Sequence, residues 1–253
     1  MMLGLTRKPP TMALTLRSLA ALLGYPSSDL QTAVPELRHA MAQETALSAS
    51  AQAGLEPLLN ALATRDLFDL QADYSELFDS TRRLSLHLFE HVHGDNKDRG
   101  QAMSDLGLEY IRHGLEMKTN ELPDYLPLFL EFTATLDPVE ARDWLRQPID
   151  VLTVLAERLE QRGTPYSGVL AALVSLADAK PDAEKLEQIG QAFAEDESKT
   201  IDELWEEAPV SFGTAAYDNG GPTGVIARIR AANRAGKSPE KGIPDGAEET
   251  THA

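Results

Sequence analysis

The sequence contains no cysteine among its 253 residues. Disulfide bonds, thiolate nucleophiles, Fe–S clusters and cysteine-based zinc sites are therefore excluded. Any bound metal ion would need histidine and carboxylate ligands. The absence of cysteine thus removes the thiol and disulfide classes of function from consideration.

Long hydrophobic runs are also absent. The longest strongly apolar segment spans residues 167–177, well short of the roughly 18 residues that a membrane-spanning helix requires. Near the N-terminus, Arg17 interrupts the apolar residues 14–23 and no small-residue cleavage site follows, so this segment is a poor export signal. We therefore expect a soluble, cytoplasmic protein without direct membrane insertion.

Positive charge is scarce. The chain has 23 Lys and Arg residues against 40 Asp and Glu, a net charge of -17 and a pI of about 4.7. Such a protein is poorly suited to bind nucleic acid or an anionic membrane, whereas a basic peptide would be attracted to it. The hydrophobic fraction of 42% is ordinary for a globular protein with a core.

Motifs for nucleotide and phosphate binding are missing as well. The chain contains neither GxGxxG nor GxxxxGK[ST], which are the fingerprints of dinucleotide and P-loop sites. A Ser-His-Asp triad is defined by geometry and cannot be assigned from residue order. No catalytic function is indicated, and we expect a protein that is not an enzyme.

Apolar residues recur at helical spacing along most of the chain, and no long segment alternates apolar and polar residues. Gly24 and Pro26 indicate the end of the first helix, Pro35 is expected to interrupt the second, and Asp73 with Glu76 forms a candidate capping box. The helices expected from this pattern span residues 14–23, 29–49, 55–63, 74–94, 98–114, 125–136, 138–146, 148–163 and 166–179. The predicted fold is all-α, a single helical bundle, with its most apolar helix, 166–179, at the centre.

Composition divides the chain into three parts. We expect a flexible N-terminal arm at residues 1–12, a helical domain at 13–213 and a disordered tail at 214–253, where Gly, Pro and charged residues dominate from Gly220 onward. Within the domain, residues 182–208 carry ten acidic residues against two lysines. Such a run more often forms a solvated helix face than a binding surface.

Three histidines lie close together in the sequence at positions 87, 91 and 93. His87 and His91 are four residues apart and would share one face of the predicted helix. Further candidate metal ligands are Glu90, Asp95 and His113. We favour a structural or groove-lining role over metal binding, because imidazoles readily exchange hydrogen bonds with a peptide. Nearby, Arg82 and Arg83 superficially resemble a twin-arginine signal, but they lie far from the N-terminus.

The segment Glu121-Leu122-Pro123-Asp124-Tyr125 precedes an apolar helix. Pro123 is suited to the first helical turn, and Asp124 could accept backbone N–H bonds at the positive end of the helix dipole. A proline-initiated, aspartate-capped helix explains these residues as well as a binding site does. The two interpretations remain open on residue chemistry alone.

Taken in order, the segments LFD, LFEHVHG, DRGQAM, YIRHGL and ELPDYLPLFLEF resemble the nitrate reductase molybdenum cofactor assembly chaperones. This is the NarJ, or nitrate reductase delta subunit, family of redox enzyme maturation chaperones. The resemblance covers residues 14–212, is strongest at 74–132, and recurs in IDELWEEAPVSF at 201–212.

The resemblance implies a chaperone that binds the immature catalytic alpha subunit of respiratory nitrate reductase through its N-terminal peptide. It would hold that subunit ready for insertion of the molybdenum cofactor until membrane docking, with molybdenum cofactor biosynthesis proteins as further partners and no cofactor of its own. The alternative is a chaperone of the same fold for a dimethyl sulfoxide, trimethylamine oxide or formate oxidoreductase. A helical His/carboxylate metalloenzyme is the remaining, least favoured alternative.

The wider chaperone group carries a Glu-Pro-x-Asp-His type motif implicated in peptide capture, which Glu121, Pro123 and Asp124 match in type. Tyr125 replaces the histidine, so a titrating group near neutral pH is lost at this position. The peptide-binding residues implied are Phe78, His87, Phe89, Glu90, His91, Asp95, Glu121, Pro123, Asp124, Tyr125 and Leu126.

Overall fold

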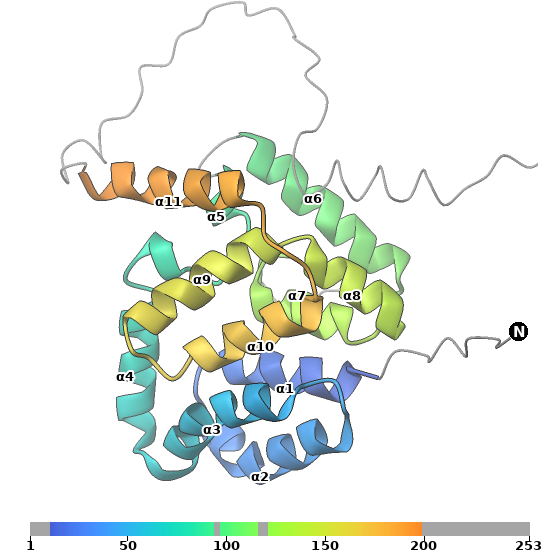
Figure 1. Cartoon of the computed structure of the whole chain (residues 1–253), viewed down its shortest axis with the longest axis vertical. Helices are drawn as coiled ribbons and strands as arrows, with labels where there is room; N and C mark the ends of the chain where they lie inside the picture. The colour runs from blue at the N-terminus through green and yellow to red at the C-terminus, as the bar shows by residue number, and fades with distance from the viewer. Residues whose placement is uncertain (1–10, 94–96, 116–120, 199–253) are drawn as a thin grey trace, which may run out of the picture. The chain divides into compact units, whose positions relative to one another are not determined.

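The computed structural model describes residues 11–93, 97–115 and 121–198 (Figure 1). These residues form eleven α-helices and one 3-10 helix, and no β-strand occurs among them. The elements are α1 (Ala13–Leu23), α2 (Ser28–Gln43), α3 (Ala49–Thr64), α4 (Leu67–Phe78), η1 (Arg82–Leu84), α5 (Glu90–His93), α6 (Lys97–Arg112), α7 (Leu126–Thr133), α8 (Pro138–Arg146), α9 (Ile149–Gln161), α10 (Ser167–Ala177) and α11 (Ala183–Ser198). The predicted all-α fold is confirmed.

Helix α10 lies at the centre of the bundle, as its uniformly apolar sequence predicted. It packs against α1, α3, α8 and α9 (Figure 1). Leu170, Leu173 and Ala177 on this helix have no exposed surface. Burial of side chains around most of the helix explains why its sequence lacks a polar face.

The crossing of α3 and α10 depends on a glycine at position 168. A Cβ atom added to Gly168 would lie 2.1 Å from the carbonyl oxygen of Gly54, whereas a Cβ added to Gly54 would meet no atom within 4 Å. Glycine at position 168 therefore allows the two backbones to approach each other closely.

The N-terminus of α1 is capped from a distance. Met12 offers no side-chain cap, and the Glu44 carboxylate instead accepts hydrogen bonds from the Leu14 N–H (3.2 Å) and from the N–H and hydroxyl of Thr15 (both 2.8 Å). A carboxylate at this position satisfies orphan amides and complements the helix dipole.

Several predicted helix boundaries were wrong. Pro35 does not interrupt α2, and Pro57 likewise lies within α3. Helix α2 ends at Gln43 instead of 49, while α3 begins at Ala49, where the Ser48 side chain accepts from the Ala51 N–H. Tertiary packing of the apolar faces outweighs the loss of a single backbone hydrogen bond at each proline.

The helix predicted at 74–94 is divided into three pieces, which is the largest error. Helix α4 begins at Leu67 with Asp66 as its cap and ends at Phe78, so Asp73 and Glu76 do not form a capping box. The short helices η1 and α5 follow. Leu84, the last residue of η1, and Leu86 and Leu88, in the segment between the two helices, are all buried. Leucine at every second position fits an extended chain against the core better than a helix.

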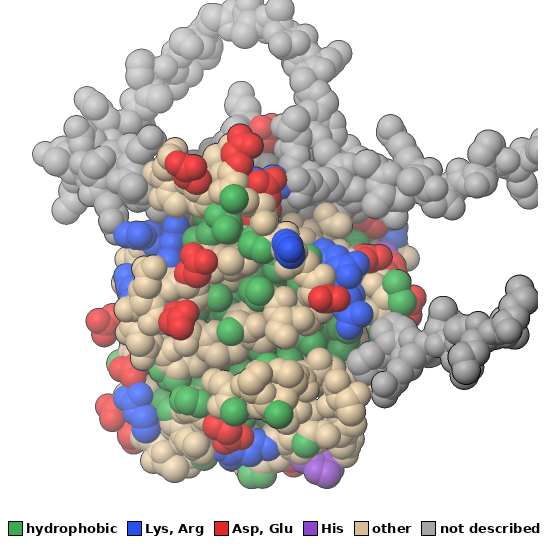
Figure 2. All heavy atoms as spheres, in the orientation of Figure 1, with side chains coloured by type: hydrophobic (Ala, Val, Ile, Leu, Met, Phe, Trp, Pro, Cys, Tyr) green, Lys and Arg blue, Asp and Glu red, His purple; other side chains and the backbone are tan. Residues whose placement is uncertain are grey.

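Helix α11 contains the first part of the acidic run and is attached to α9. The Asp150 carboxylate accepts from the Asp182 N–H (2.7 Å) and pairs with Lys185 (3.5 Å). Acidic side chains gather over α11 on the face shown in Figure 2. Of the predicted arm at residues 1–12, residues 1–10 lie outside the described residues, as do the predicted tail at 214–253 and the acidic residues after 198. Met12, in the described part of the arm, is 2% exposed.

None of the helices in the described ranges is long and apolar enough to cross a membrane.

Candidate functional site

The two motifs singled out in the sequence meet in a short antiparallel bridge between His87 and Tyr125. The Leu88 N–H donates to the Asp124 carbonyl (3.0 Å), and the Leu126 N–H donates to the Leu86 carbonyl (2.8 Å). The segment after η1 is thereby fixed to the turn that precedes α7. We call residues 86–89 and 124–126 the bridge joint.

Asp124 is the buried centre of the bridge joint. Its side chain has no exposed surface. One carboxylate oxygen accepts from the Phe89 N–H (3.0 Å) and the other from Nδ1 of His87 (3.2 Å). Two charge-assisted bonds in a buried environment hold the two segments in one arrangement.

The predicted role of Asp124 as a helix cap was wrong. Helix α7 begins at Leu126 with Tyr125 at the N-cap position and Pro127 in the first turn. Pro123 lies in the preceding turn, where the Tyr125 N–H donates to the Leu122 carbonyl (3.0 Å). Asp124 does accept a backbone N–H, but that N–H belongs to Phe89.

His87 and His91 do not share a helical face, because His87 lies in the bridge joint and α5 begins at Glu90. The His87 side chain is 27% exposed. Its hydrogen bond to Asp124 raises its pKa above 6.5, although burial opposes the shift. His91 is 4% exposed, donates from Nε2 to the Ser85 carbonyl (2.8 Å), and has its pKa lowered to about 4 by burial. The two histidines therefore favour opposite protonation states.

Tyr125 connects the bridge joint to α4. Its hydroxyl lies 3.3 Å from the Tyr74 hydroxyl, which donates to the Leu23 carbonyl (2.8 Å). Its ring lies 5.4 Å from the His87 ring, measured between centroids. Burial raises the pKa of Tyr125, so the phenol stays protonated. Sequence periodicity placed Tyr74 only on a buried face and missed this polar contact.

The remaining predicted site residues differ in their positions. Phe89 and Leu126, which belong to the bridge joint, and Phe78 of α4 are all buried in the core. Glu90 pairs with Arg99 (3.0 Å), and Glu121 is exposed. Asp95 lies outside the described residues. The structure therefore brings together the bridge-joint residues, and Phe78 reaches them through its ring contact with Tyr74 (4.8 Å).

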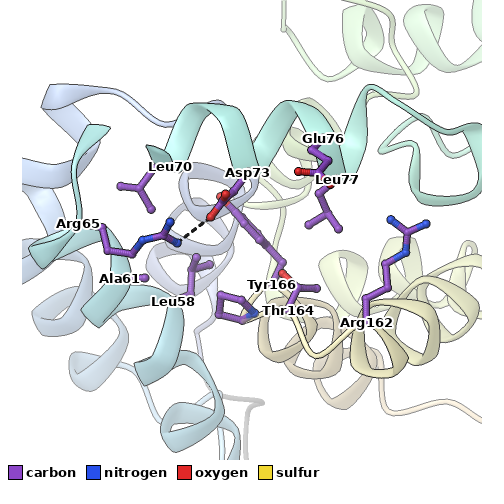
Figure 3. A pocket seen from close by; sticks show the side chains of 11 residues that line it. Leu58, Ala61, Arg65, Leu70, Asp73, Glu76, Leu77, Arg162, Thr164 and Tyr166 are labelled. Carbon is purple, nitrogen blue, oxygen red and sulfur yellow. Dashed lines mark ion pairs between the residues drawn. The ribbon is translucent and has the colours of Figure 1, made fainter. Parts of the chain in front are cut away.

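A pocket of about 420 Å³, which the sequence did not predict, lies beside this site (Figure 3). It is formed by α3, α4 and the segment between α9 and α10. The apolar lining comes from Leu58, Ala61, Leu70, Leu77, Pro165 and Tyr166, and the polar lining from Arg65, Asp73, Glu76, Arg162 and Thr164. Its lining residues are far apart in the sequence, so no local motif could have indicated it.

Among the residues that the structure describes, no three histidine or carboxylate side chains are arranged to hold a metal ion. His113, one of the candidate ligands, lies 3.3 Å from Glu140 and contacts the rings of Phe132 and Trp144. The site is thus built from hydrogen bonds and aromatic contacts between helices.

Comparison with known proteins identifies the family of the chain. A family profile described as the nitrate reductase delta subunit matches residues 28–172. The chain is also 42% identical over 192 residues to the nitrate reductase molybdenum cofactor assembly chaperone NarJ of Escherichia coli K12, covering 76% of this chain and 81% of that protein. The chain belongs to the nitrate reductase delta subunit family. The resemblance found in the sequence is confirmed.

Other members of the delta subunit family are also similar. The probable nitrate reductase molybdenum cofactor assembly chaperone NarW of E. coli K12 is 41% identical over 61% of this chain and 66% of its own length. The probable chaperone NarJ of Bacillus subtilis is 28% identical over 71% of this chain and 96% of its own length. A solved putative redox enzyme maturation protein from Archaeoglobus fulgidus superposes on 70% of this chain and all of that chain, with 20% identity and a TM-score of 0.48. That likeness is too weak to add to the sequence relationship. Membership of a family of assembly chaperones agrees with the expectation of a chaperone and not an enzyme.

Proposed function

We propose that this chain is a dedicated cytoplasmic chaperone of respiratory nitrate reductase. It binds the immature catalytic alpha subunit through that subunit's N-terminal peptide and holds it ready for insertion of the molybdenum cofactor. It releases the subunit before or during docking at the membrane. Molybdenum cofactor biosynthesis proteins are further partners, and the chaperone needs no cofactor itself.

The observation that best supports this proposal is the bridge joint. The buried Asp124 carboxylate fixes the segment that contains His87 to the segment that contains Tyr125. Glu121 is exposed, and His87 and Tyr125 are half-buried. A peptide can therefore meet a hydroxyl, an imidazole and a carboxylate whose backbones are already ordered. Preorganisation of this kind lowers the entropic cost of binding.

The charge of the chain supports the same kind of ligand. A net charge of -17 attracts a basic segment over distances longer than a hydrogen bond. Attraction of this type speeds encounter more than it tightens the final complex, which suits a chaperone that must release its client.

Calorimetric titration of the full chain with a synthetic N-terminal peptide of the alpha subunit tests the proposal. We expect saturable binding, and we expect the combined Tyr125→Phe and Glu121→Gln change to weaken it by about tenfold, which corresponds to about 1.4 kcal/mol. Glu131→Gln is the matched control, because Glu131 is exposed on α7. Asp124→Ala is a poor first variant, since removing a buried carboxylate would disturb the fold.

Absence of saturable binding by the unaltered chain would contradict the proposal. Binding to the N-terminal peptide of a dimethyl sulfoxide, trimethylamine oxide or formate oxidoreductase in its place would assign the chain to another client. Equal weakening by the control variant would contradict the role given to Tyr125 and Glu121.

A further inference from the structure

We propose that the pocket between α3, α4 and the α9–α10 segment is an anchor subsite for the client peptide. It would receive one large apolar side chain of the peptide, next to a basic residue held at the rim. This inference rests on the proposed function and adds a second contact region, none of whose lining residues was among the predicted peptide-binding residues.

The size and lining of the pocket suit a side chain better than a whole helix. Its volume of about 420 Å³ is at the lower end of the range of roughly 300–1,000 Å³ found for ligand sites. Leu58, Leu70 and Leu77 line it together with the ring of Tyr166 (Figure 3). An apolar side chain entering this space would leave water and contact apolar groups from three elements.

The rim carries charges of both signs, with Arg65 and Arg162 beside Asp73 and Glu76. Asp73 pairs with Arg65 (2.7 Å), and both side chains remain partly exposed. Glu76, one turn further along α4, has no ion-pair partner among the described residues and is exposed. Asp66, Asp69, Asp73 and Glu76 recur at intervals of three and four residues and are all exposed, so they form an acidic stripe along α4. The stripe favours a peptide that carries Lys or Arg beside its apolar anchor.

The pocket is directly connected to the bridge joint through aromatic rings. Tyr166 of the pocket contacts Phe78 and Tyr74, with centroids 5.1 and 6.0 Å apart. The Tyr74 hydroxyl then meets the Tyr125 hydroxyl at 3.3 Å. Because Tyr74 contacts both Tyr166 and Tyr125, the two regions lie close together, and the proposal places one short peptide across both.

Two tryptophan variants of the full chain test the inference. Ala61 lines the pocket, whereas Ala63 is exposed on the same helix and does not line it. In titrations with the N-terminal peptide of the alpha subunit, we expect Ala61→Trp to weaken binding by at least about tenfold and Ala63→Trp by less than about twofold. Circular dichroism melts of both variants report whether each one folds.

Peptide variants identify the anchor. In peptides whose large apolar residues are replaced one at a time by alanine, one replacement should weaken binding to the unaltered chain by about tenfold. The same replacement should cost little further affinity in Ala61→Trp, because the pocket is already filled. If the alanine replacement in the peptide and Ala61→Trp in the chain weakened binding additively, that side chain would not occupy the pocket.

A fluorescent label provides a second measurement that does not depend on Ala61→Trp folding. The chain has no cysteine, so Thr164→Cys at the pocket and Ala63→Cys outside it each give a single labelling site. Peptide addition should shift the emission of the label at 164 and leave that at 63 unchanged.

Unaltered affinity in Ala61→Trp, or an unchanged label at 164 during saturable binding, would overturn the anchor subsite while the proposed function stands. Failure of the unaltered chain to bind the peptide would contradict both proposals.

Discussion

At the scale of single residues, Asp124 has the largest effect on the geometry of the site. Its two carboxylate oxygens hold the Phe89 N–H and the His87 ring, and none of its surface is exposed. We expect Asp124→Ala to lower the free energy of unfolding by about 2–4 kcal/mol, because the buried Phe89 N–H and the half-buried His87 ring would both lose this acceptor. Urea denaturation followed by circular dichroism measures the change.

Glu121→Ala is the control for this stability measurement, because Glu121 is three residues away and exposed. Its effect on the free energy of unfolding should stay within about 0.5 kcal/mol. Equal stability of the Asp124→Ala and Glu121→Ala variants would contradict the structural role of the buried carboxylate.

His91 makes stability depend on pH. Burial lowers its pKa from 6.5 to about 4, so the folded state favours the neutral ring. Above pH 6.5 the His91 ring is neutral in both the folded and the unfolded state, and the folded state pays no penalty for burying it. As the pH falls from 6.5 toward 4, the unfolded state gains a proton that the folded state resists, and the folded state loses stability. Between pH 7 and pH 5 this group should remove about 2 kcal/mol from the free energy of unfolding.

The raised pKa of His87 acts in the opposite direction, since its contribution is present at low pH and is lost as the pH rises. The contribution of His91 is therefore best isolated by comparing variants. Urea denaturation of His91→Gln at pH 7 and pH 5 should show a smaller pH effect than the unaltered chain. His39→Gln, which changes an exposed histidine, should retain the full effect; an equal reduction in both variants would rule out His91 as the source.

At the scale of secondary-structure elements, the α3–α10 crossing gives a sharp contrast between two glycines. A Cβ at Gly168 would collide with the Gly54 carbonyl, while one at Gly54 has open space. We expect Gly168→Ala to destabilise the protein by about 1–3 kcal/mol or more through overpacking. Gly54→Ala should stabilise it by about 0.5–1 kcal/mol, because alanine is the better helix former.

Denaturant unfolding of the two glycine variants checks the crossing, since both introduce one methyl group into a helix. Similar free energies of unfolding for the two variants would mean that α3 and α10 can separate at little cost. Because α3 contributes Leu58 and Ala61 to the pocket, displacement of α3 by Gly168→Ala should also weaken binding of the alpha-subunit peptide.

The sequence predicted helices best where periodicity and local stop signals agreed. Helix α8 spans 138–146 as expected, and the central place of α10 followed from its apolar composition. The prediction failed at 74–94, where Leu84, Leu86 and Leu88 fit both a helix and an extended chain. Pairing of residues 86–88 with residues 124–126 selects the extended conformation. Because residues 124–126 lie far along the chain, local sequence could not predict this pairing.

The site was predictable only in part for the same reason. Asp124, His87 and Tyr125 could be selected as chemically informative, but their mutual contacts depend on how α4, the bridge joint and α7 pack. Tyr74 gave a purely apolar signal, although its hydroxyl reaches both Leu23 and Tyr125. The pocket has no local sequence signature, because three separate segments line it.

At the scale of the whole molecule, acidic charge dominates. The net charge is -17, and on the face shown in Figure 2 acidic side chains stand beside basic ones with a concentration over α11. Charge spread in this way produces a long-range field and does not by itself form a specific site. The field attracts a basic peptide as it approaches the chain, whereas the bridge joint and the pocket bind the peptide after contact.

The last prediction concerns this separation between approach and contact. When salt rises from about 20 to about 200 mM, screening shortens the range of the field to less than about 10 Å. We expect the association rate constant for the alpha-subunit peptide to fall by about tenfold, while the dissociation rate constant changes by less than about threefold. Stopped-flow fluorescence of the full chain labelled at Thr164→Cys measures both constants.

A peptide in which glutamine replaces each lysine and arginine is the control for this measurement. Its association rate constant should be lower at low salt and nearly independent of salt, because it carries no positive side chains for the acidic chain to attract. A salt effect confined to the dissociation rate constant would show that the charges act in the bound complex. The positive side chains of the peptide would then be attracted by the acidic stripe on α4 within the complex, and not by the net charge of the molecule during approach.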